Sequence, residues 1–174
     1  MIFLETEISG VHLVEPEFIE DERGYFTRSF CEREFADAGI KFLPIQCNIS
    51  YNKKAYTLRG MHFLAAPYEE TKLVRCSAGK IFDVAVDIRP NSPSFKKWVG
   101  FELSRENARA LFIPAGCAHG FLTLEDETEV FYQMSPAYVP GHDRGFRWND
   151  PAIGIKWPAE PKVISARDAG LGFP

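Results

Sequence analysis

Two histidines lie in segments where an imidazole could act on a small molecule. His62 interrupts the apolar residues 57–63, and His119 lies within residues 114–121, whose glycines let backbone approach a ligand. Each imidazole taken alone is also compatible with a buried side chain whose only role is a satisfied hydrogen bond. Histidine changes charge near neutral pH, so either residue could abstract or donate a proton.

Tyr132 and Lys72 are polar residues on strand faces that are otherwise apolar. Tyr132 alternates with Val130 and Met134, which directs its hydroxyl toward an interior where a phenol needs a partner or a role. Lys72 opens a strand whose next inward position is Val74, and lysine is rarely buried without a reason. Together with the two histidines, these residues favour acid–base chemistry in an interior cavity.

Arg59 could supply positive charge to the same cavity. Strict alternation along a strand would place Arg59 and His62 on opposite faces. Gly60 lies between them, and a β-bulge at this glycine would re-aim one of the two side chains. The other residues considered as anion ligands are Arg23, His119 and Arg167.

Several other chemistries are disfavoured by the sequence. The histidines are isolated, with no HxH, HxxxH or HExxH spacing, so a convergent metal site is not expected. There is no GxSxG motif, no local pairing of cysteine with histidine, and no glycine-rich phosphate loop. We therefore expect a protein that uses neither a metal nor another cofactor.

The composition indicates an ordinary globular protein rich in aromatic residues. Of the 174 residues, 45% are hydrophobic and 14% aromatic, and the length suits one domain spanning residues 1–174. A net charge of −4 gives no basic field for nucleic acid or a membrane surface. Four scattered cysteines, no basic signal region at the N-terminus and no membrane-length apolar run predict a cytoplasmic protein.

Many short strands with Gly- and Pro-containing turns predict an all-β sandwich or barrel. The clearest signal is a hairpin of residues 72–76 and 81–88, whose second arm alternates with period two. The tail from Trp148 onward is expected to pack across the outside. Further strands are expected at residues 11–18, 25–30, 98–103, 110–113, 121–124 and 129–135.

One or two short helices should accompany these strands. A capping box that begins at Ser29, followed by a stop at Gly39, predicts a helix over residues 30–38. Ser104 could cap a second helix of a single turn.

Seven segments of the chain form an ordered series of motifs. They are DERGYF at 21–26, LRGMHF at 58–63, KLVRC at 72–76, FDVAVDIRPNSPSFKKWVG at 82–100, IPAGCAHGF at 113–121, DRGFRWNDPAIGIKWP at 143–158 and ISARD at 164–168. In this order, and over nearly the full length, the chain resembles the dTDP-4-dehydrorhamnose 3,5-epimerase family. Their number and order make the resemblance specific, although any one motif alone would be weak.

The resemblance implies a metal-free, cupin-type jelly-roll barrel, usually a homodimer that exchanges an N-terminal strand. It also implies epimerisation at C3, C5 or both of a nucleotide-diphospho-4-keto-6-deoxyhexose, linked to dTDP by default. The 4-keto group acidifies the hydrogens on C3 and C5, because the carbanion is delocalised as an enolate. This reaction suits the proton-transferring residues described above.

The same motifs imply a role for each site residue. His62 is implied as the general base, with Asp168 as its orienting partner, and alternation makes Asp83 a second possible partner. Tyr132 is implied as the proton donor, and Lys72 as the residue beside the keto oxygen. The implied substrate-binding residues are Arg23, Arg59, His119 and Arg167 at the diphosphate or nucleotide, Gln46 and Asn48 along the site, Tyr138 stacked on the nucleobase, and Arg28 and Asp143.

The chain departs from the usual family pattern at three places. Arg28 stands where members commonly have Glu, Cys47 where they often have Asp, and Phe63-Leu64 where they have a Tyr-Gln pair. Since the resemblance implies that the first position lies near the nucleobase-binding region of the family, we expect weaker discrimination in favour of dTDP. The last change removes polar groups beside the general base, so the set of inverted centres could differ.

Three alternatives stay open on the sequence. The chain could be a family member that acts at C3 alone, or on a CDP- or GDP-linked sugar. It could also be a non-catalytic barrel that binds nucleotide sugars, or a metal-dependent cupin oxygenase. The sequence leaves the nucleobase, the number of inverted centres and the pathway undetermined.

Overall fold

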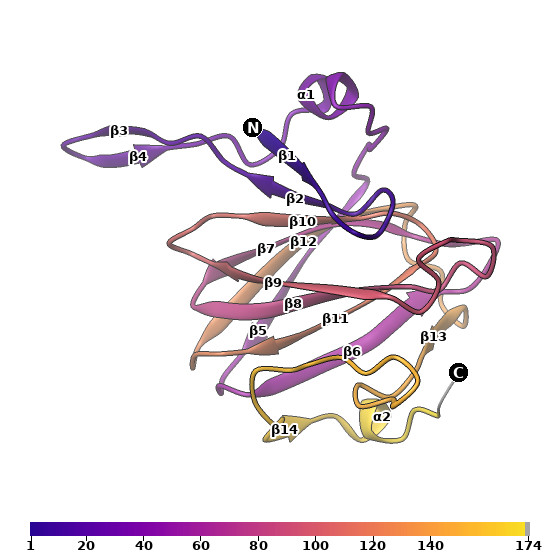
Figure 1. Ribbon diagram of the computed structural model, residues 1–174. Coiled ribbons are helices and arrows are strands. Elements are labelled where there is room, and N and C mark those ends of the chain that lie inside the picture. The colour runs from indigo at the N-terminus through magenta and orange to yellow at the C-terminus, as the bar shows by residue number, and fades with distance from the viewer. Residues whose placement is uncertain (173–174) are drawn as a thin grey trace.

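The computed structural model describes residues 1–172 and consists mainly of short strands joined by turns (Figure 1). This confirms the all-β prediction, and the helices α1 (Glu32–Asp37) and α2 (Ala166–Ala169) are both short. Residues 173 and 174, the last two of the predicted domain, lie outside the described range. No helix within residues 1–172 is long and apolar enough to cross a membrane.

Two facing sheets form the body of the fold, which is the predicted cupin-type jelly roll (Figure 1). The first sheet has the order β1 (Ile2–Glu5), β2 (His12–Glu15), β10 (Ala110–Ile113), β7 (Thr71–Ala78), β12 (Thr128–Ser135) and β5 (Gln46–Asn52). The second has the order β13 (Asp143–Gly145), β6 (Thr57–Leu64), β11 (Cys117–Thr123), β8 (Lys80–Asp87) and β9 (Trp98–Ser104). The short strand β14 (Val163–Ile164) pairs with β6 in parallel.

The predicted hairpin of residues 72–76 and 81–88 is wrong, because β7 pairs with β10 and β12 in the first sheet and β8 pairs with β11 and β9 in the second. Both strands nevertheless supply much of the core. Along β8, Ile81 and Ala85 pack in the cluster between the two sheets, whereas Val84 and Val86 pack in a separate cluster on the other face. All four side chains are fully buried. The period-two pattern is therefore confirmed, with both faces of the strand covered.

The C-terminal tail packs across the outside of the second sheet, as predicted. Phe146 and Ile153 join the outer cluster of β8, and the Trp157 ring lies edge-on to Phe82 with 6.1 Å between centroids. After this crossing the chain returns along β6 as β14 and ends its described part just beyond α2. The tail thereby brings α2 to the rim of the barrel.

The helix α1 is shorter than the sequence pattern predicted. It begins at Glu32, and its N-cap is Cys31, which makes no side-chain capping bond, so the capping box at Ser29 is wrong. The Phe30 ring instead packs on the rings of other core aromatics, outside the helix. The predicted stop is confirmed, because the backbone of Gly39 takes a φ of +78°.

Several other boundaries differ from the predictions. β2 ends before Pro16, since proline has no N–H to donate to a strand ladder, and β4 covers only Gly24–Phe26. The residues after Ser104 form a turn and not a helix. Ser104 accepts from the N–H of Asn107 as a cap would, but the backbone of Ala108 takes a φ of +46°, which ends the turn. The pattern also did not predict β1, β3 (Ile19–Asp21), β5, β13, β14 or α2.

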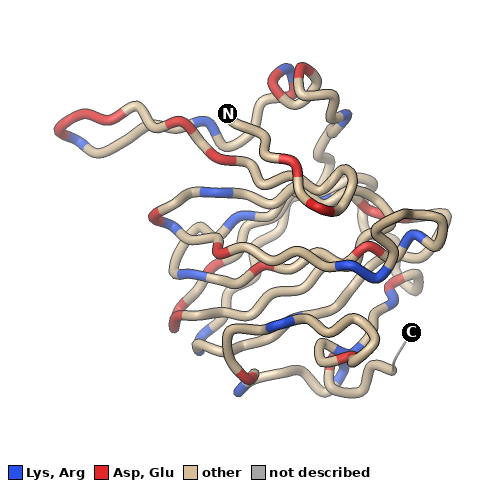
Figure 2. The backbone as a smooth tube through the Cα atoms, viewed as in Figure 1, with Lys and Arg blue, Asp and Glu red and all other residues tan. Residues whose placement is uncertain are grey.

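A hairpin of β3 (Ile19–Asp21) and β4 projects from the body as an arm (Figure 1). Its two strands pair only with each other, and its tip carries several charged residues (Figure 2). Phe18, Ile19, Tyr25 and Phe26 are exposed along it. An isolated two-stranded hairpin is marginally stable in water, so this β3–β4 arm lacks the cover that its apolar residues need.

Candidate active site

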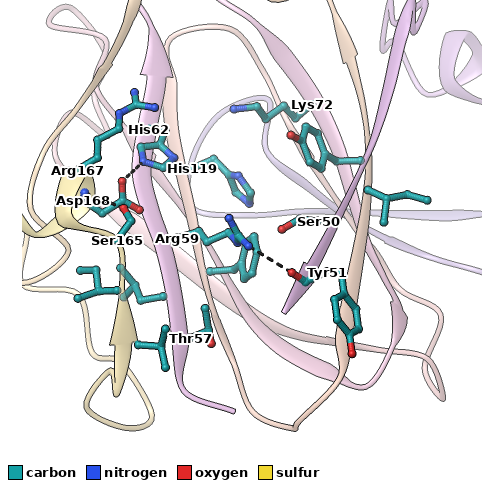
Figure 3. Close-up of a pocket in the computed structure, with 16 residues that line it drawn as sticks. Ser50, Tyr51, Thr57, Arg59, His62, Lys72, His119, Ser165, Arg167 and Asp168 are labelled. Carbon is teal, nitrogen blue, oxygen red and sulfur yellow. Dashed lines mark hydrogen bonds and ion pairs between the residues drawn. The ribbon is translucent and has the colours of Figure 1, made fainter. Parts of the chain in front are cut away.

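A cavity of about 620 Å³ lies between the two sheets and brings together the residues first singled out in the sequence. His62 and His119 come from β6 and β11 on one wall, and Lys72 and Tyr132 come from β7 and β12 on the other. Figure 3 shows His62 and Lys72 approaching the cavity from opposite sides, with Asp168 of α2 beside His62. The cavity therefore has two chemically different walls.

His62 is paired with the carboxylate of Asp168 (Figure 3). Its Nε2 atom lies 2.7 Å from Oδ1 of Asp168, and the backbone N–H of Gly60 donates to Oδ2 of the same carboxylate at 3.1 Å. The Ser165 hydroxyl caps α2 by accepting from the N–H of Asp168, which holds the carboxylate in place. The Asp168 side chain is buried, whereas the imidazole of His62 is partly exposed to the cavity.

The environment of Asp168 favours its charged form. Burial has the largest influence on the pKa of Asp168 and would raise it. The hydrogen bond and charge of His62, the N–H of Gly60 and the charge of Arg167 together outweigh burial, so the pKa lies below its ordinary value. Asp168 can therefore stabilise the imidazolium that forms when His62 accepts a proton.

The predicted β-bulge at Gly60 is confirmed and directs both Arg59 and His62 into the cavity. Between these two residues β6 has one more residue than the facing part of β11. Gly60 has a φ of +134°, and a Cβ atom there would lie 2.6 Å from the Cα atom of Gly120. Only glycine meets both conditions, so the sequence Arg-Gly-Met-His can present its arginine and its histidine on one side.

Tyr132 and Lys72 are diagonal neighbours on the opposite wall, according to the register of β12 and β7. The Tyr132 hydroxyl has no hydrogen-bond partner among residues 1–172, although a buried phenol was expected to have one. Burial, followed by the negative charge of Glu70, raises the pKa of Tyr132, while Arg59 opposes this effect. Tyr132 therefore remains a phenol at neutral pH and can donate a proton into the cavity.

Arg59 is a cation whose partners are neutral. Its Nε donates to Oδ1 of Asn52 at 2.8 Å and its Nη2 donates to the carbonyl oxygen of Tyr51 at 3.3 Å (Figure 3). Within the described part of the chain it forms no ion pair with a carboxylate. A guanidinium in this state is available to phosphate oxygens.

Asp83 contacts His119 and not His62. The Nε2 atom of His119 lies 2.7 Å from Oδ1 of Asp83, and both side chains are buried. Each cavity histidine thus has its own carboxylate partner, and residues 1–172 contain no convergent group of three or more metal-ligating side chains.

A smaller cavity of about 370 Å³ adjoins the first and shares His62, Lys72 and Tyr132 with it. At its rim the hydroxyl of Tyr138 donates to Oδ1 of Asp143 at 2.8 Å, and Arg167 pairs with the other oxygen of that carboxylate. The sequence-predicted residues that line it are Gln46, Asn48, Tyr138, Asp143 and Arg167.

Arg23 and Arg28 lie outside both cavities of the chain. Arg23 is at the tip of the β3–β4 arm, where its side chain is 85% exposed and ion-paired with Asp21. Arg28 pairs with Glu34 of α1. Because the arm projects from the body, it carries Arg23 away from the site that the chain itself forms (Figure 1).

Glu70 and Ser50 are among the polar residues of the cavities that were not singled out from the sequence. Glu70 is buried, and its Oε1 lies 2.5 Å from Nζ of Lys72. The Ser50 hydroxyl lines the larger cavity and has no partner among residues 1–172. Ser50 belongs to β5, where polar residues alternate with the exposed Cys47, Ile49 and Tyr51. Such an inverted strand, polar inside and apolar outside, is the signal that could have revealed a polar interior.

The fold and its cavities define a class of protein: a jelly-roll barrel that presents a histidine–aspartate pair opposite a tyrosine and a lysine. The model of the family described as dTDP-4-dehydrorhamnose 3,5-epimerase matches residues 5–173. A relative of that name from Shigella flexneri is 46% identical over 169 residues, covering 97% of this chain and 93% of the relative. The chain belongs to the dTDP-4-dehydrorhamnose 3,5-epimerase family.

Solved structures with the same fold include complexes with nucleotides. The dTDP-4-dehydrorhamnose 3,5-epimerase of Bacillus anthracis, with TDP and PPi bound, has a TM-score of 0.96 and 39% identity, with 99% of each chain covered. The dTDP-6-deoxy-D-glucose-3,5-epimerase of Legionella pneumophila, in complex with dTDP-4-keto-L-rhamnose, has a TM-score of 0.93 and 37% identity, covering 99% of this chain and 92% of that one.

Proposed function

We propose that this chain is an epimerase that inverts C3, C5 or both of a dTDP-linked 4-keto-6-deoxyhexose. The observation that carries the proposal is the placement of the His62–Asp168 pair on one wall and of Tyr132 and Lys72 on the other. Epimerisation needs a base on one face of the sugar and an acid on the opposite face. Family membership supports the same reaction.

The reaction begins when His62 removes the proton from C3 or C5, next to the keto group. The electron pair of the broken C–H bond moves into the ring and onto the C4 oxygen, which gives an enolate. Lys72 stabilises the developing negative charge on that oxygen, and Asp168 stabilises the imidazolium. Tyr132 then donates its phenolic proton to the opposite face of the same carbon. Proton exchange with solvent returns neutral His62 and the phenol of Tyr132.

The substrate's diphosphate would be held by the cationic side of the larger cavity. Arg59 has no carboxylate partner among the described residues, and His119 is fixed beside it by Asp83. Charge-assisted hydrogen bonds from a guanidinium suit phosphate oxygens. The smaller cavity, with Gln46 and Asn48, offers neutral polar contacts to the rest of the ligand.

One NMR assay tests the proposed function. The purified protein is incubated in heavy water with dTDP-, CDP- and GDP-linked 4-keto-6-deoxyhexoses, and the label at C3 and C5 is followed together with product configuration. We expect deuterium at the inverted centre or centres and an epimeric product with the dTDP sugar, and neither with a His62→Ala control. Binding of the dTDP sugar without any exchange would instead indicate a non-catalytic barrel.

We also propose that the protein acts as a homodimer in which the β3–β4 arm of one chain reaches the cavity of the other. The exposed apolar residues of the arm support this, and so does the outer face of β5 with Ile49 and Tyr51, next to the exposed Ile45 that precedes the strand. A second chain would cover both surfaces. It would also place Arg23, which lies far from the cavity of its own chain, beside the substrate in the cavity of the second chain.

A mixing experiment tests the exchange of arms. Arg23→Ala and His62→Ala chains are each assayed alone and then after co-refolding or co-expression. If the arm crosses, a mixed dimer has one site with both native residues, so epimerase activity returns. Failure of the mixture to gain activity, with co-purification of differently tagged chains showing that mixed dimers have formed, would contradict the exchange.

A reducing compartment such as the cytoplasm is the proposed location, supported by four cysteines that are all free thiols. This proposal predicts the protein in the soluble fraction of fractionated cells, without a membrane-associated pool.

A further inference from the structure

Glu70 is a buried carboxylate in direct contact with Lys72. Glu70 is 8% exposed and Lys72 is 9% exposed. The Oε1 atom of Glu70 lies 2.5 Å from the Nζ atom of Lys72. Both side chains line the smaller cavity together with Tyr132. Glu70 precedes β7 and has no place in the chemistry described so far.

A buried ammonium group needs a partner to keep its charge. Removing a charge from water without compensation costs enough that an isolated buried lysine tends to lose its proton. A neutral amine could not stabilise an enolate oxygen by charge. The carboxylate of Glu70 supplies the compensation at a distance typical of a charge-assisted hydrogen bond. It also restricts the long Lys72 side chain to one direction.

We infer that Glu70 is a positioning residue of the epimerisation, which pairs with the buried ammonium group of Lys72 and aims it at the keto oxygen, beside Tyr132 on the same wall. This inference rests on the proposed function. It adds Glu70 to the wall opposite His62. The carboxylate of Glu70 acts on both groups that meet the enolate: it contacts Lys72, and its negative charge acts on Tyr132.

The electrostatics around this wall agree with that role. After burial, the negative charge of Glu70 is the next cause that raises the pKa of Tyr132, so loss of this charge would make the phenol lose its proton at lower pH. The other carboxylates of the two cavities are engaged elsewhere, Asp168 with His62 and Asp143 with Arg167. The remaining ionisable groups that line the two cavities are Tyr51, Arg59, His119 and Tyr138.

The test compares Glu70→Gln and Glu70→Asp with wild type, and uses Glu69→Gln as the matched control. Glu69 is the neighbouring carboxylate, lines neither cavity and forms no ion pair within residues 1–172. For each protein we would measure kcat and KM for the dTDP-linked 4-keto sugar across pH, deuterium uptake, and thermal unfolding. Thermal unfolding shows whether a variant is folded when it is assayed.

Glu70→Gln should lower kcat by about tenfold or more, as loss of an orienting partner often does, with little change in KM. The alkaline limb of its pH profile should move to lower pH, because the phenol of Tyr132 loses its proton more easily without the negative charge of Glu70. Deuterium uptake and epimer formation should fall together. Glu70→Asp should restore the position of the alkaline limb, and Glu69→Gln should match wild type.

Different results separate this inference from the proposed function. A folded Glu70→Gln protein with a wild-type kcat and an unmoved alkaline limb would overturn the role of Glu70 while leaving the epimerase proposal intact. A change in thermal stability alone would also overturn it, since that is what a merely structural ion pair would give. If Glu70→Gln fails to fold, Glu70→Asp provides the test. An alkaline limb at its wild-type position supports the role of Glu70. An alkaline limb that moves to lower pH although the carboxylate is retained contradicts that role. A wild-type protein inactive on 4-keto sugars would overturn both proposals.

Discussion

The Nε2 atom of His62 and the Oδ1 atom of Asp168 lie 2.7 Å apart although 106 positions separate the two residues in the chain. The contact exists because the tail crosses the second sheet and returns along β6 to place α2 at the barrel rim. A pair built from such distant segments depends on the whole fold and is not a product of local sequence.

This pair gives the first prediction. His62→Ala should abolish solvent deuterium exchange into the substrate, and Asp168→Ala should lower it by about 10²-fold or more, because both residues serve one proton transfer. Asp83→Asn is the comparison, since Asp83 contacts His119. It should affect KM more than exchange. If Asp83→Asn damages exchange more than Asp168→Ala, the assignment of the pair is wrong.

Arg59 should contribute to binding and not to proton transfer. Arg59→Ala should raise KM for the nucleotide sugar by about 10- to 100-fold, the usual worth of hydrogen bonds to a charged group. The exposed Arg105 outside the cavities provides a matched control, and Arg105→Ala should leave KM unchanged. Kinetics at two salt concentrations would check the electrostatic origin, because the difference should shrink as salt rises. Equal KM values for both variants would contradict the role of Arg59.

The cysteines should divide into two classes of reactivity. Burial raises the pKa of Cys76 and of Cys117 to about 12, so at pH 8 both remain thiols, and it is the thiolate that reacts. Cys47 is exposed and Cys31 is partly exposed. Mass spectrometry after brief alkylation at pH 8 should find label on Cys47 first and on Cys76 and Cys117 only after unfolding. Rapid labelling of Cys76 in the folded protein would contradict the packing of the barrel interior.

Activity should not depend on a metal ion. Both cavity histidines are paired with carboxylates, and the described residues offer no convergent ligand set. Extended dialysis against EDTA should therefore leave kcat unchanged, with elemental analysis of the dialysed protein as the check. Loss of activity that zinc, iron or manganese restores would favour a metal-dependent cupin.

The sequence predicted the architecture best where the pattern was regular. The alternation of residues 81–88 identified β8 correctly, because both of its faces are buried by other elements. Gly60 identified the bulge, since few residues other than glycine tolerate that backbone. α2 escaped prediction because it has only four residues, too few for helical periodicity to show.

The candidate site was predictable in part. His62, Tyr132 and Lys72 attracted attention as polar residues on apolar strand faces, whereas Asp168 and the nucleotide-binding residues came only from the resemblance to a family. Glu70 was missed because it lies before β7, in a loop segment where a second glutamate precedes it and both look like solvated surface. The position of Arg23 depends on where the arm projects, which no local pattern indicates.

The central claim is that base and acid act from opposite walls, so abstraction and inversion can be separated at Tyr132. The Tyr132 hydroxyl has no partner among residues 1–172, so Tyr132→Phe should change the free energy of unfolding by no more than about 1 kcal/mol. His62, Asp168 and Lys72 remain in place in this variant, and the enolate should still form.

The decisive measurement follows deuterium uptake and product configuration in the same tube with Tyr132→Phe in heavy water. His62 should return the proton to the face from which it came, so we predict continued exchange at C3 or C5 with little epimer. Full epimerisation by the variant would contradict the account, because the proton for the opposite face would then come from water or from another side chain.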